Sequence, residues 1–584
     1  MRSYHYEAIL RHLHLSDIQL SAMSTSSSAT GVDTGAENTP PQLSALFLIR
    51  FDKKVGYTIA WKRSSVHVPL DGAVEFKSLP SGLHTVKNDL VYFVHQGYAG
   101  LSAYAKGAAS AEERNAEFVS VGILVSRAYG RLGRSWLLAA RLRSIAATLA
   151  GDPSATAPLE EFWEEQSAHQ ASGSAQGKTD KAQQQQQQQQ QHKTHSRARA
   201  LSTITDVTPS DTSLPPFHPA LSMLQYVEMF GPLVFRLQQA ALLRKRILFV
   251  GSPPVRNSCE FVYDLSVLSS IPPHATEFLS PGTDSLLRLP ALFSIGVNDI
   301  TELEQMNSAK AGDISSEASD VPVQGWVANT TDEIITMKKQ LYDIVVEMPP
   351  TYDAPPEQRQ WPTMKTSDGA PIKASQRDMA RFKMLWRELR RHEQEVASAR
   401  GEGEDYENDD DDDGNNDDND DQAALLPRHK TSAGDGVDSS IGEQTVEPIT
   451  WSQLAYNGFM WWASAGEQHA YTSGERDRDL DLLGDLSDYG EGLPTAIIAY
   501  FHRSTTQLIN GVNSVIEGAD DDDNGNEDEE VVVVDKEDLS RMGLDTWSEA
   551  DRAFLSEFVW MWFGRIIEVR GTSIDCCGVR IPVP

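Results

Sequence analysis

The stretch Pro232-Leu-Val-Phe-Arg-Leu-Gln-Gln-Ala-Ala-Leu-Leu-Arg244, followed after Lys245 by Arg246-Ile-Leu-Phe-Val250, decides the fold class of this sequence. Apolar residues recur at helical spacing through its first part, which predicts an amphipathic helix. The second part has almost no polar position, as is typical of a buried parallel strand covered by helices. Gly251-Ser-Pro-Pro254 ends this strand, and a further helix is predicted over 259–268. Helix, buried strand and helix together indicate an α/β fold.

The sequence on either side of this stretch continues the α/β pattern. Helices are predicted over 221–230 and 332–341. Short strands are predicted over 291–296, 325–328 and 342–347. We therefore expect a central α/β module over residues 214–350.

An α+β module is predicted upstream, over residues 43–150. Its expected strands form one hairpin over 46–51 and 57–61, a second pair over 89–94 and 100–104 around Gly97, and a fifth strand over 118–125. An amphipathic helix with interspersed arginines is predicted over 134–149.

A mainly helical module is predicted downstream, over residues 449–584. Its expected helices cover 451–463, 494–516 and 549–562, with a terminal strand over 565–569. A further helix over 378–399 precedes it, within the segment 351–448.

Low-complexity segments separate these modules. We predict a disordered leader over 1–42 and a flexible linker over 151–213, which contains nine consecutive glutamines, Gln183–Gln191. Glu402–Asp421 carries 13 acidic residues, and Asp520–Glu530, in a second insert over 519–530, carries eight. Without these 21 residues the net charge of −33 becomes about −12, so the acidity belongs to solvated inserts.

The composition excludes several classes of protein. The acidic balance argues against a nucleic-acid-binding face, and no run reaches the ~18–20 apolar residues that span a bilayer. The three cysteines, Cys259, Cys576 and Cys577, allow no disulfide framework, as expected in a reducing compartment. We expect a cytoplasmic protein without a secretory signal or transmembrane segment, which can reach membranes through a partner.

The search for catalytic chemistry finds decoys only. Gly173-Ser-Ala-Gln-Gly-Lys-Thr179 lacks one residue of a phosphate-binding loop and the strand that should precede it. His392-Glu393 has no second histidine at zinc-ligand spacing. Cys576-Cys577 reads as incidental thiols or as a palmitoylation site. We therefore expect no catalytic residue, no cofactor and no metal.

Several separated motifs carry a family resemblance. Phe76-Lys-Ser-Leu-Pro-Ser-Gly-Leu-His84 followed by Asp89-Leu-Val-Tyr-Phe93 resembles the signature of LCHN-type DENN proteins, and so do Phe230-Gly-Pro-Leu-Val-Phe235, Leu292-Phe-Ser-Ile-Gly-Val-Asn-Asp299 and Gly325-Trp-Val-Ala-Asn-Thr-Thr-Asp332. The resemblance implies a tripartite architecture: a longin-like module, a central α/β module and a helical C-terminal module.

The resemblance also implies a function. DENN proteins bind Rab-type small GTPases, and many act as guanine nucleotide exchange factors. Exchange needs only differential binding to nucleotide states, without covalent catalysis. A DENN-fold adaptor without exchange activity is the alternative, and fungal members are linked to lipid metabolism and lipid droplets. Arg244, Lys245 and Arg246 are candidate GTPase contacts, although a basic cluster there also suits the end of a helix.

Overall fold

A computed structural model describes residues 40–52, 54–107, 118–152, 154–176, 214–308, 325–350, 360–399, 445–449, 454, 473–486, 492–522, 531–570, 573–576 and 579–582. The predicted leader, the glutamine tract, the long acidic run and the helix predicted over 451–463 therefore lie outside the described residues, apart from isolated positions.

An antiparallel half-sheet forms the N-terminal part. Its strands are β1 (Leu43–Asp52), β2 (Gly56–Ser64), β3 (Asn88–His95), β4 (Tyr98–Lys106) and β5 (Phe118–Ser126). The predicted pairs β1–β2 and β3–β4 are confirmed. Gln96 and Gly97 both adopt positive φ at the β3–β4 turn, the backbone that a two-residue hairpin requires.

Helices cover this half-sheet. α3 (Ala139–Gly151) packs against β4 and β5, and a 3-10 turn over Ser135–Leu138 replaces the start of the predicted helix. α4 (Ala157–Gln176) packs against β1 and occupies the first part of the stretch predicted as a linker. The prediction missed this helix because most of its residues are polar. The helix is stabilised by the burial of two apolar side chains, Leu159 and Phe162.

Parallel strands and helices alternate in the central part, as predicted. The elements are α6 (Met223–Phe230), α7 (Leu233–Leu242), β6 (Ile247–Val250), α8 (Arg256–Leu268), β7 (Ala291–Ser294), α9 (Ile300–Ser308), β8 (Val327–Thr330), α10 (Glu333–Met337) and β9 (Ile344–Glu347). β6 pairs in parallel with β8 on one side and β9 on the other. Ile247, Leu248 and Phe249 are fully buried, which confirms the strand predicted from their apolar run.

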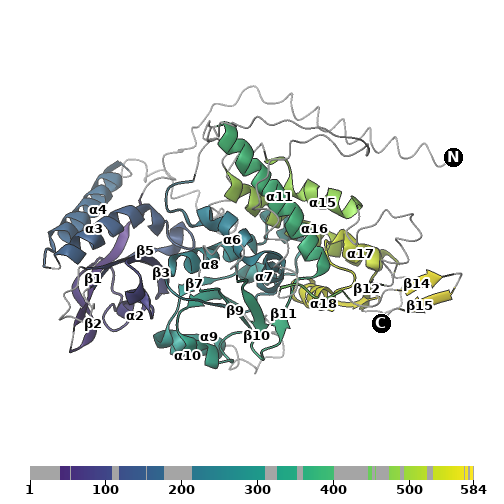
Figure 1. Ribbon diagram of the computed structural model, residues 1–584, viewed down its shortest axis with the longest axis horizontal. Coiled ribbons are helices and arrows are strands. Elements are labelled where there is room, and N and C mark those ends of the chain that lie inside the picture. Colours follow the sequence, from purple (N-terminus) through teal and green to yellow (C-terminus); the bar gives the residue numbers. More distant parts are fainter. Residues whose placement is uncertain are drawn as a thin grey trace, which may run out of the picture. The chain divides into compact units, whose positions relative to one another are not determined.

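The two parts form one sheet of 11 strands, in the order β11-β10-β9-β6-β8-β7-β3-β4-β5-β1-β2. Figure 1 shows β3 beside β7, and the ladder between them registers Phe93 with Phe293. β10 (Thr363–Thr366) and β11 (Pro371–Ile372) add an antiparallel edge that the sequence did not predict. Hereafter β1–β5 are the N-terminal half-sheet and β6–β11 the central half-sheet.

The C-terminal part is mainly helical. Its helices are α11 (Gln376–Ala399), α15 (Ser473–Leu483), α16 (Leu493–Asp522), α17 (Lys536–Arg541) and α18 (Glu549–Phe563). The strands β12 (Val531–Val534) and β13 (Ile566–Val569) pair in parallel, and β14 (Ser573–Cys576) and β15 (Val579–Pro582) pair antiparallel. α16 extends into the predicted acidic insert, while its apolar face, which includes Ile497 and Phe501, joins the core that also contains Leu46 and Phe261. The predicted α/β and α+β fold class with a mainly helical C-terminal region is confirmed, whereas one sheet shared by the first two parts was not predicted.

Candidate functional site

The carboxyl ends of the parallel strands gather at one edge of the central half-sheet. Because β6, β7 and β8 run parallel, the loops after them meet there, and this edge is the usual ligand-binding edge of α/β sheets. Two carboxylates shape the loops. Asp299 accepts a hydrogen bond from the Gly296 amide (2.9 Å), and Asp332 accepts one from the Val297 amide (3.1 Å).

A lysine of the N-terminal part reaches this edge. Lys77, on α2 (Val74–Ser78), places its Nζ 2.6 Å from Asp299 Oδ1 and 3.3 Å from Glu302 Oε2. The same Nζ donates to the Val94 carbonyl (3.0 Å). Only 11% of the Lys77 side chain is exposed, so this ion pair is screened less than a surface pair and ties the two half-sheets together.

A second polar contact crosses the same junction. Asp89, at the start of β3, accepts hydrogen bonds from the backbone amides of Val255 (2.7 Å) and Arg256 (3.3 Å). These amides belong to the first turn of α8, where a carboxylate is favoured by the helix dipole. Burial nevertheless raises the pKa of Asp89 to about 6, although the backbone amides and Arg256 oppose the rise.

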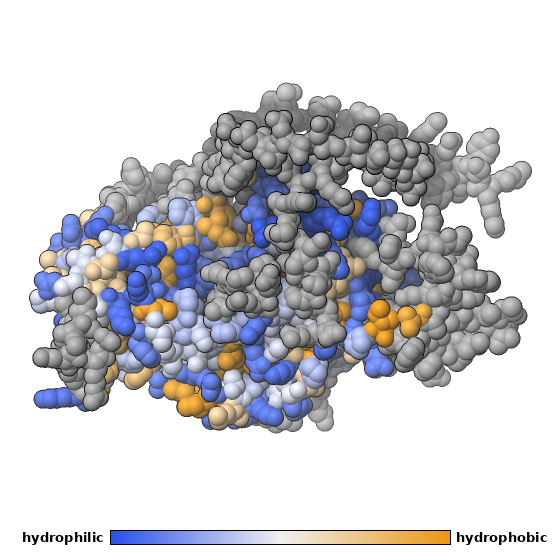
Figure 2. Space-filling view, viewed as in Figure 1, coloured by the Kyte–Doolittle hydropathy of each residue, from blue (hydrophilic) through white to orange (hydrophobic). Residues whose placement is uncertain are grey.

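Apolar side chains stand exposed next to this edge. Met306 on α9 and Ile334 and Met337 on α10 form what we call the α9–α10 patch, and Met337 is 76% exposed. Figure 2 shows hydrophobic surface over α10, at the lower edge of the view. The Lys338–Glu304 ion pair (2.9 Å) joins the two helices. Exposed apolar groups with a charged rim are typical of protein-binding surfaces.

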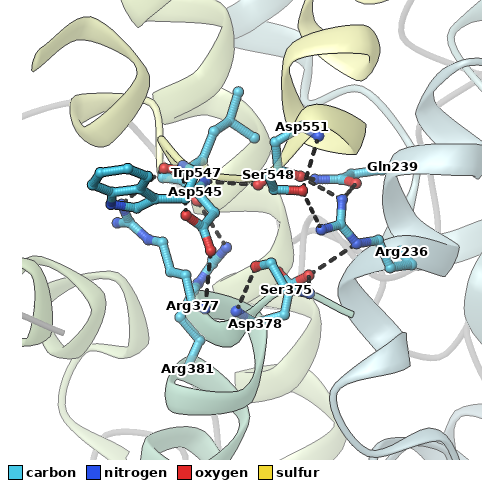
Figure 3. Close-up of polar contacts among 12 residues, drawn as sticks. Arg236, Gln239, Ser375, Arg377, Asp378, Arg381, Asp545, Trp547, Ser548 and Asp551 are labelled. Atoms are coloured by element: carbon cyan, nitrogen blue, oxygen red, sulfur yellow. Dashed lines mark hydrogen bonds and ion pairs between the residues drawn. The ribbon is translucent and has the colours of Figure 1, made fainter. Parts of the chain in front are cut away.

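A buried ion cluster links the central part to the C-terminal helices. Figure 3 shows Arg236 of α7 between two carboxylates, with its Nε 3.1 Å from Asp378 Oδ2 and its Nη1 bonded to Asp551. Asp551 also accepts hydrogen bonds from Gln239 Nε2 (2.9 Å) and from the Asp545 amide (2.6 Å). Burial opposes the charge of Arg236, but Asp378 and Asp551 outweigh it and raise its pKa.

Two arginines of α11 extend this ion cluster. Arg377 Nη1 donates to Glu475 Oε1 (2.8 Å) and to the Leu544 carbonyl (3.1 Å). Arg381 Nη2 donates to the Tyr500 hydroxyl (3.1 Å), and its guanidinium lies 4.4 Å from the centre of the Phe235 ring. The cluster therefore connects α7, α11, α15, α16 and α18. We read it as structural, because its charged groups are buried or nearly so and form ion pairs with one another.

The three candidate contacts lie apart from the carboxyl-end edge. Arg244 is only 2% exposed, because its guanidinium donates to the carbonyls of Leu286, Ala241 and Ser269 and stacks 5.1 Å from the Trp562 ring. The Arg244 side chain therefore lies inside the protein at the end of α7, and the expectation that its charge is exposed is wrong. Lys245 pairs with Glu557, and Arg246 Nη2 lies 2.6 Å from Asp343 Oδ1. Both remain partly exposed.

The structure also shows where the rejected phosphate-loop, zinc and cysteine motifs of the sequence lie. The first residues of Gly173–Thr179 lie in α4, whereas 177–179 lie outside the described residues. His392 and Glu393 belong to α11. No group of three metal-ligating side chains occurs within the described ranges. In the same part of the chain, no helix is long and apolar enough to cross a membrane. Cys259 is a buried thiol, its Sγ 3.4 Å from Asn329 Oδ1, and Cys577 falls outside the described residues.

Comparisons with known proteins find animal and fungal relatives. The profile of a family described as DENN domain-containing protein 11 matches residues 46–357, and a domain of unknown function, DUF4484, matches 446–530 and 521–582. DENN domain-containing protein 11 of Danio rerio is 32% identical over 308 residues, which are 52% of this chain and 54% of that protein. Uncharacterized protein ANR2 of Saccharomyces cerevisiae is 23% identical over 568 residues, which are 92% of this chain and 94% of that protein. The chain thus spans about half the length of the animal relative.

Proposed function

Because the chain belongs to the DENN domain-containing protein 11 family, we propose that it binds a Rab-type small GTPase and acts as a guanine nucleotide exchange factor in membrane traffic. DENN domain proteins generally act as exchange factors for Rab GTPases. One observation carries the proposal: the family match runs from β1 to β9 and so includes the strands on both sides of the junction, and the Phe93–Phe293 ladder joins them into one sheet. A GTPase can therefore contact both halves at once.

We assign the GTPase contact to the carboxyl-end edge and the adjoining α9–α10 patch. The patch offers apolar area, and Glu302 and Glu304 supply a polar rim. Exchange requires tighter binding to the nucleotide-free GTPase than to the GDP-bound form, which a rigid docking surface supplies without a nucleophile or metal. Lys245 and Arg246 stay secondary candidates. They precede the amino end of β6, whereas the proposed contact lies at its carboxyl end.

The adaptor is the second candidate function. A DENN-fold protein that binds a GTPase without releasing its nucleotide would use the same surface, on endomembranes or lipid droplets. We propose further that the protein belongs to a fungal, LCHN-type branch of the family, and the match of the yeast protein ANR2 along nearly the whole chain supports a fungal relationship. In both cases we propose a cytoplasmic protein that reaches membranes through its partner.

A nucleotide-release assay separates these candidates. The full chain is added to a panel of Rab GTPases loaded with fluorescent GDP, and binding to each nucleotide-free GTPase is measured in parallel. Accelerated release from at least one GTPase supports exchange, whereas binding without release supports the adaptor. If the chain binds no GTPase of the panel, both candidates are refuted.

A variant of the patch locates the contact. Met337→Asp places a charge in the α9–α10 patch, and Leu221→Asp, at another exposed apolar position, is the matched control. We expect Met337→Asp to weaken GTPase binding by about ten-fold or more, the effect of a central interface residue, and Leu221→Asp to leave it unchanged. Equal binding by both variants would move the contact elsewhere on the sheet.

A further inference from the structure

Two arginine-bearing segments meet at the carboxyl end of α8, because Ser266 of this helix accepts a hydrogen bond from Arg131 and donates its own Oγ hydrogen to the carbonyl of Leu289, the residue after Arg288 (2.5 Å). Arg131 donates Nε to Ser266 Oγ (2.7 Å), and Nη2 to the Ser266 carbonyl (2.8 Å) and Ser270 Oγ (2.7 Å). All of these partners are neutral. Within the described residues, Arg131 makes no ion pair.

The charges that act on Arg131 are almost all of its own sign. Burial lowers the pKa of Arg131 to about 10, and the positive charges of Arg288 and Arg127 lower it further, against a small opposing effect of Tyr263. Burial also lowers the pKa of Arg127 and of Arg288. No carboxylate contributes to any of these three shifts. In the described part of the chain, neither Arg127 nor Arg288 has a hydrogen-bond or ion-pair partner for its side chain.

This arrangement is unfavourable as it stands. The carbonyls at the end of α8 offset the charge of Arg131, because cations are favoured at helix carboxyl ends. No such group offsets Arg127 and Arg288, which share a half-buried environment with a third guanidinium. Partly buried charges normally have a counter-charge. A bound anion would supply the charge that the cluster lacks.

The loop that carries Arg127 and Arg131 has a constrained backbone. A 3-10 turn over Arg127–Tyr129 is followed by Gly133, whose φ is +56°. A Cβ atom at Gly133 would lie 2.5 Å from the Ser126 carbonyl oxygen and 2.7 Å from Val125 Cγ2, so only glycine fits. The turn therefore fixes the backbone that carries Arg127 and Arg131, and hydrogen bonds to α8 fix the Arg131 side chain, which lowers the entropic cost of binding a ligand.

We propose that Arg127, Arg131 and Arg288 form a binding site for a phosphate-bearing anion. The planar guanidinium matches phosphate oxygens with two parallel N–H donors, and several arginines together neutralise a multiply charged group. Arg127 and Arg288 are partly exposed, so a ligand reaches them from solvent, while Arg131 stays anchored to α8. The phosphate belongs either to a soluble compound or to a phosphorylated lipid headgroup. This site is separate from the GTPase surface proposed above.

The test uses the full-length chain and pyrophosphate as the probe. Melting temperature is followed against pyrophosphate concentration, with sodium chloride at matched ionic strength as the reference. The variant Arg127→Gln/Arg288→Gln removes two charges of the site, and Arg391→Gln, an exposed arginine of α11, is the control. We expect saturable stabilisation of the wild type and of Arg391→Gln, and affinity weakened about ten-fold or more in the double variant.

A second measurement keeps the proposal testable if the double variant folds poorly. Arg288→Gln alone relieves repulsion in the ligand-free chain, so its melting temperature without pyrophosphate should equal or exceed that of the wild type, whereas a structural arginine would lower it. Co-sedimentation with phosphatidylcholine vesicles, with and without phosphatidylinositol phosphate, then distinguishes the sources. Arginine-dependent sedimentation identifies a headgroup, and pyrophosphate binding without it identifies a soluble ligand. Absent stabilisation, or equal stabilisation of the double variant, overturns the proposal.

Discussion

The two junctions of this protein are held together by different physical means. The N-terminal and central half-sheets meet through a short antiparallel ladder at Phe93 and Phe293, with Lys77 and Asp89 as polar contacts at its edge. The central part and the C-terminal helices meet through the buried ion cluster around Arg236 instead. A backbone ladder tolerates changes of side chain, whereas a buried ion cluster depends on every charge in it.

This contrast suggests that the two junctions have different functions. The ladder leaves the carboxyl-end edge and the α9–α10 patch exposed beside it. The first junction can therefore connect the two half-sheets and also offer a surface to a partner. The ion cluster connects five helices, and its charged groups are buried or nearly so. We infer that the second junction fixes the C-terminal helices on the central part, and that its side chains tolerate substitution less than those of the first.

The largest effect should follow from breaking the ion cluster. Asp551→Ala leaves the buried Arg236 without its best partner, and we expect the free energy of unfolding to fall by about 3–5 kcal/mol. Glu549→Ala, two residues away and exposed on the same helix, should change it by about 0.5 kcal/mol or less. Urea unfolding of both variants measures the difference.

A double variant sharpens this result. Replacing the pair by apolar groups, as Arg236→Met/Asp551→Leu, removes both charges and should recover part of the stability lost in Asp551→Ala. No recovery would mean that Gln239 and Asp378 depend on the pair as well, since both contact it.

The ion cluster should also respond to pH. Burial raises the pKa of Asp378 to about 6, with Asp551 raising it further and Arg236 and Arg381 opposing. Because the folded state then binds the proton more tightly than the unfolded state, the contribution of this group to stability is greatest below about pH 4 and is lost as pH rises through about 6, by about 3 kcal/mol in total. In Asp378→Asn that slope should flatten. Denaturant unfolding at a series of pH values tests this, and an unchanged slope in the variant contradicts it.

The first junction should show a smaller effect. Asp89→Ala removes the carboxylate that caps α8 from another part of the chain, and loss of such a cap costs about 1–2 kcal/mol. Asp71→Ala, at an exposed aspartate paired with Lys62, is the control and should cost no more than about 0.5 kcal/mol. If Asp89→Ala destabilised the chain as much as Asp551→Ala, the distinction between the junctions would fail.

Local pattern predicted the elements better than it predicted the junctions. The apolar run Ile247–Phe249 identified β6, because a buried strand leaves a signature in its own residues. β10 leaves none, since three of the four residues in Thr363-Met-Lys-Thr366 are polar and the strand lies near the sheet edge. Arg236 reads in sequence as one polar position on an amphipathic helix. Its two partners lie more than a hundred residues downstream, so no local pattern could reveal the ion cluster.

The joining of the half-sheets was hidden for the same reason. The strands β1–β9 were predicted in the right order, but the sheet that they share depends on one ladder between positions far apart in the chain. The candidate contacts illustrate the limit for single side chains. Arg244-Lys-Arg246 reads as one basic surface, yet Arg244 points inward to backbone carbonyls, because the end of α7 is covered by Trp562.

The smallest effect on stability is expected on the exposed surface beside the first junction. Ile334 is 57% exposed on α10, so Ile334→Asp removes little buried area and should change the free energy of unfolding by about 0.5 kcal/mol or less. Ile335, its neighbour, is fully buried, and Ile335→Ala should cost about 2–5 kcal/mol. Urea unfolding compares the pair, and GTPase binding is measured on the same samples. If Ile334→Asp lost stability as Ile335→Ala does, the exposed residue would be part of the core rather than of a contact surface.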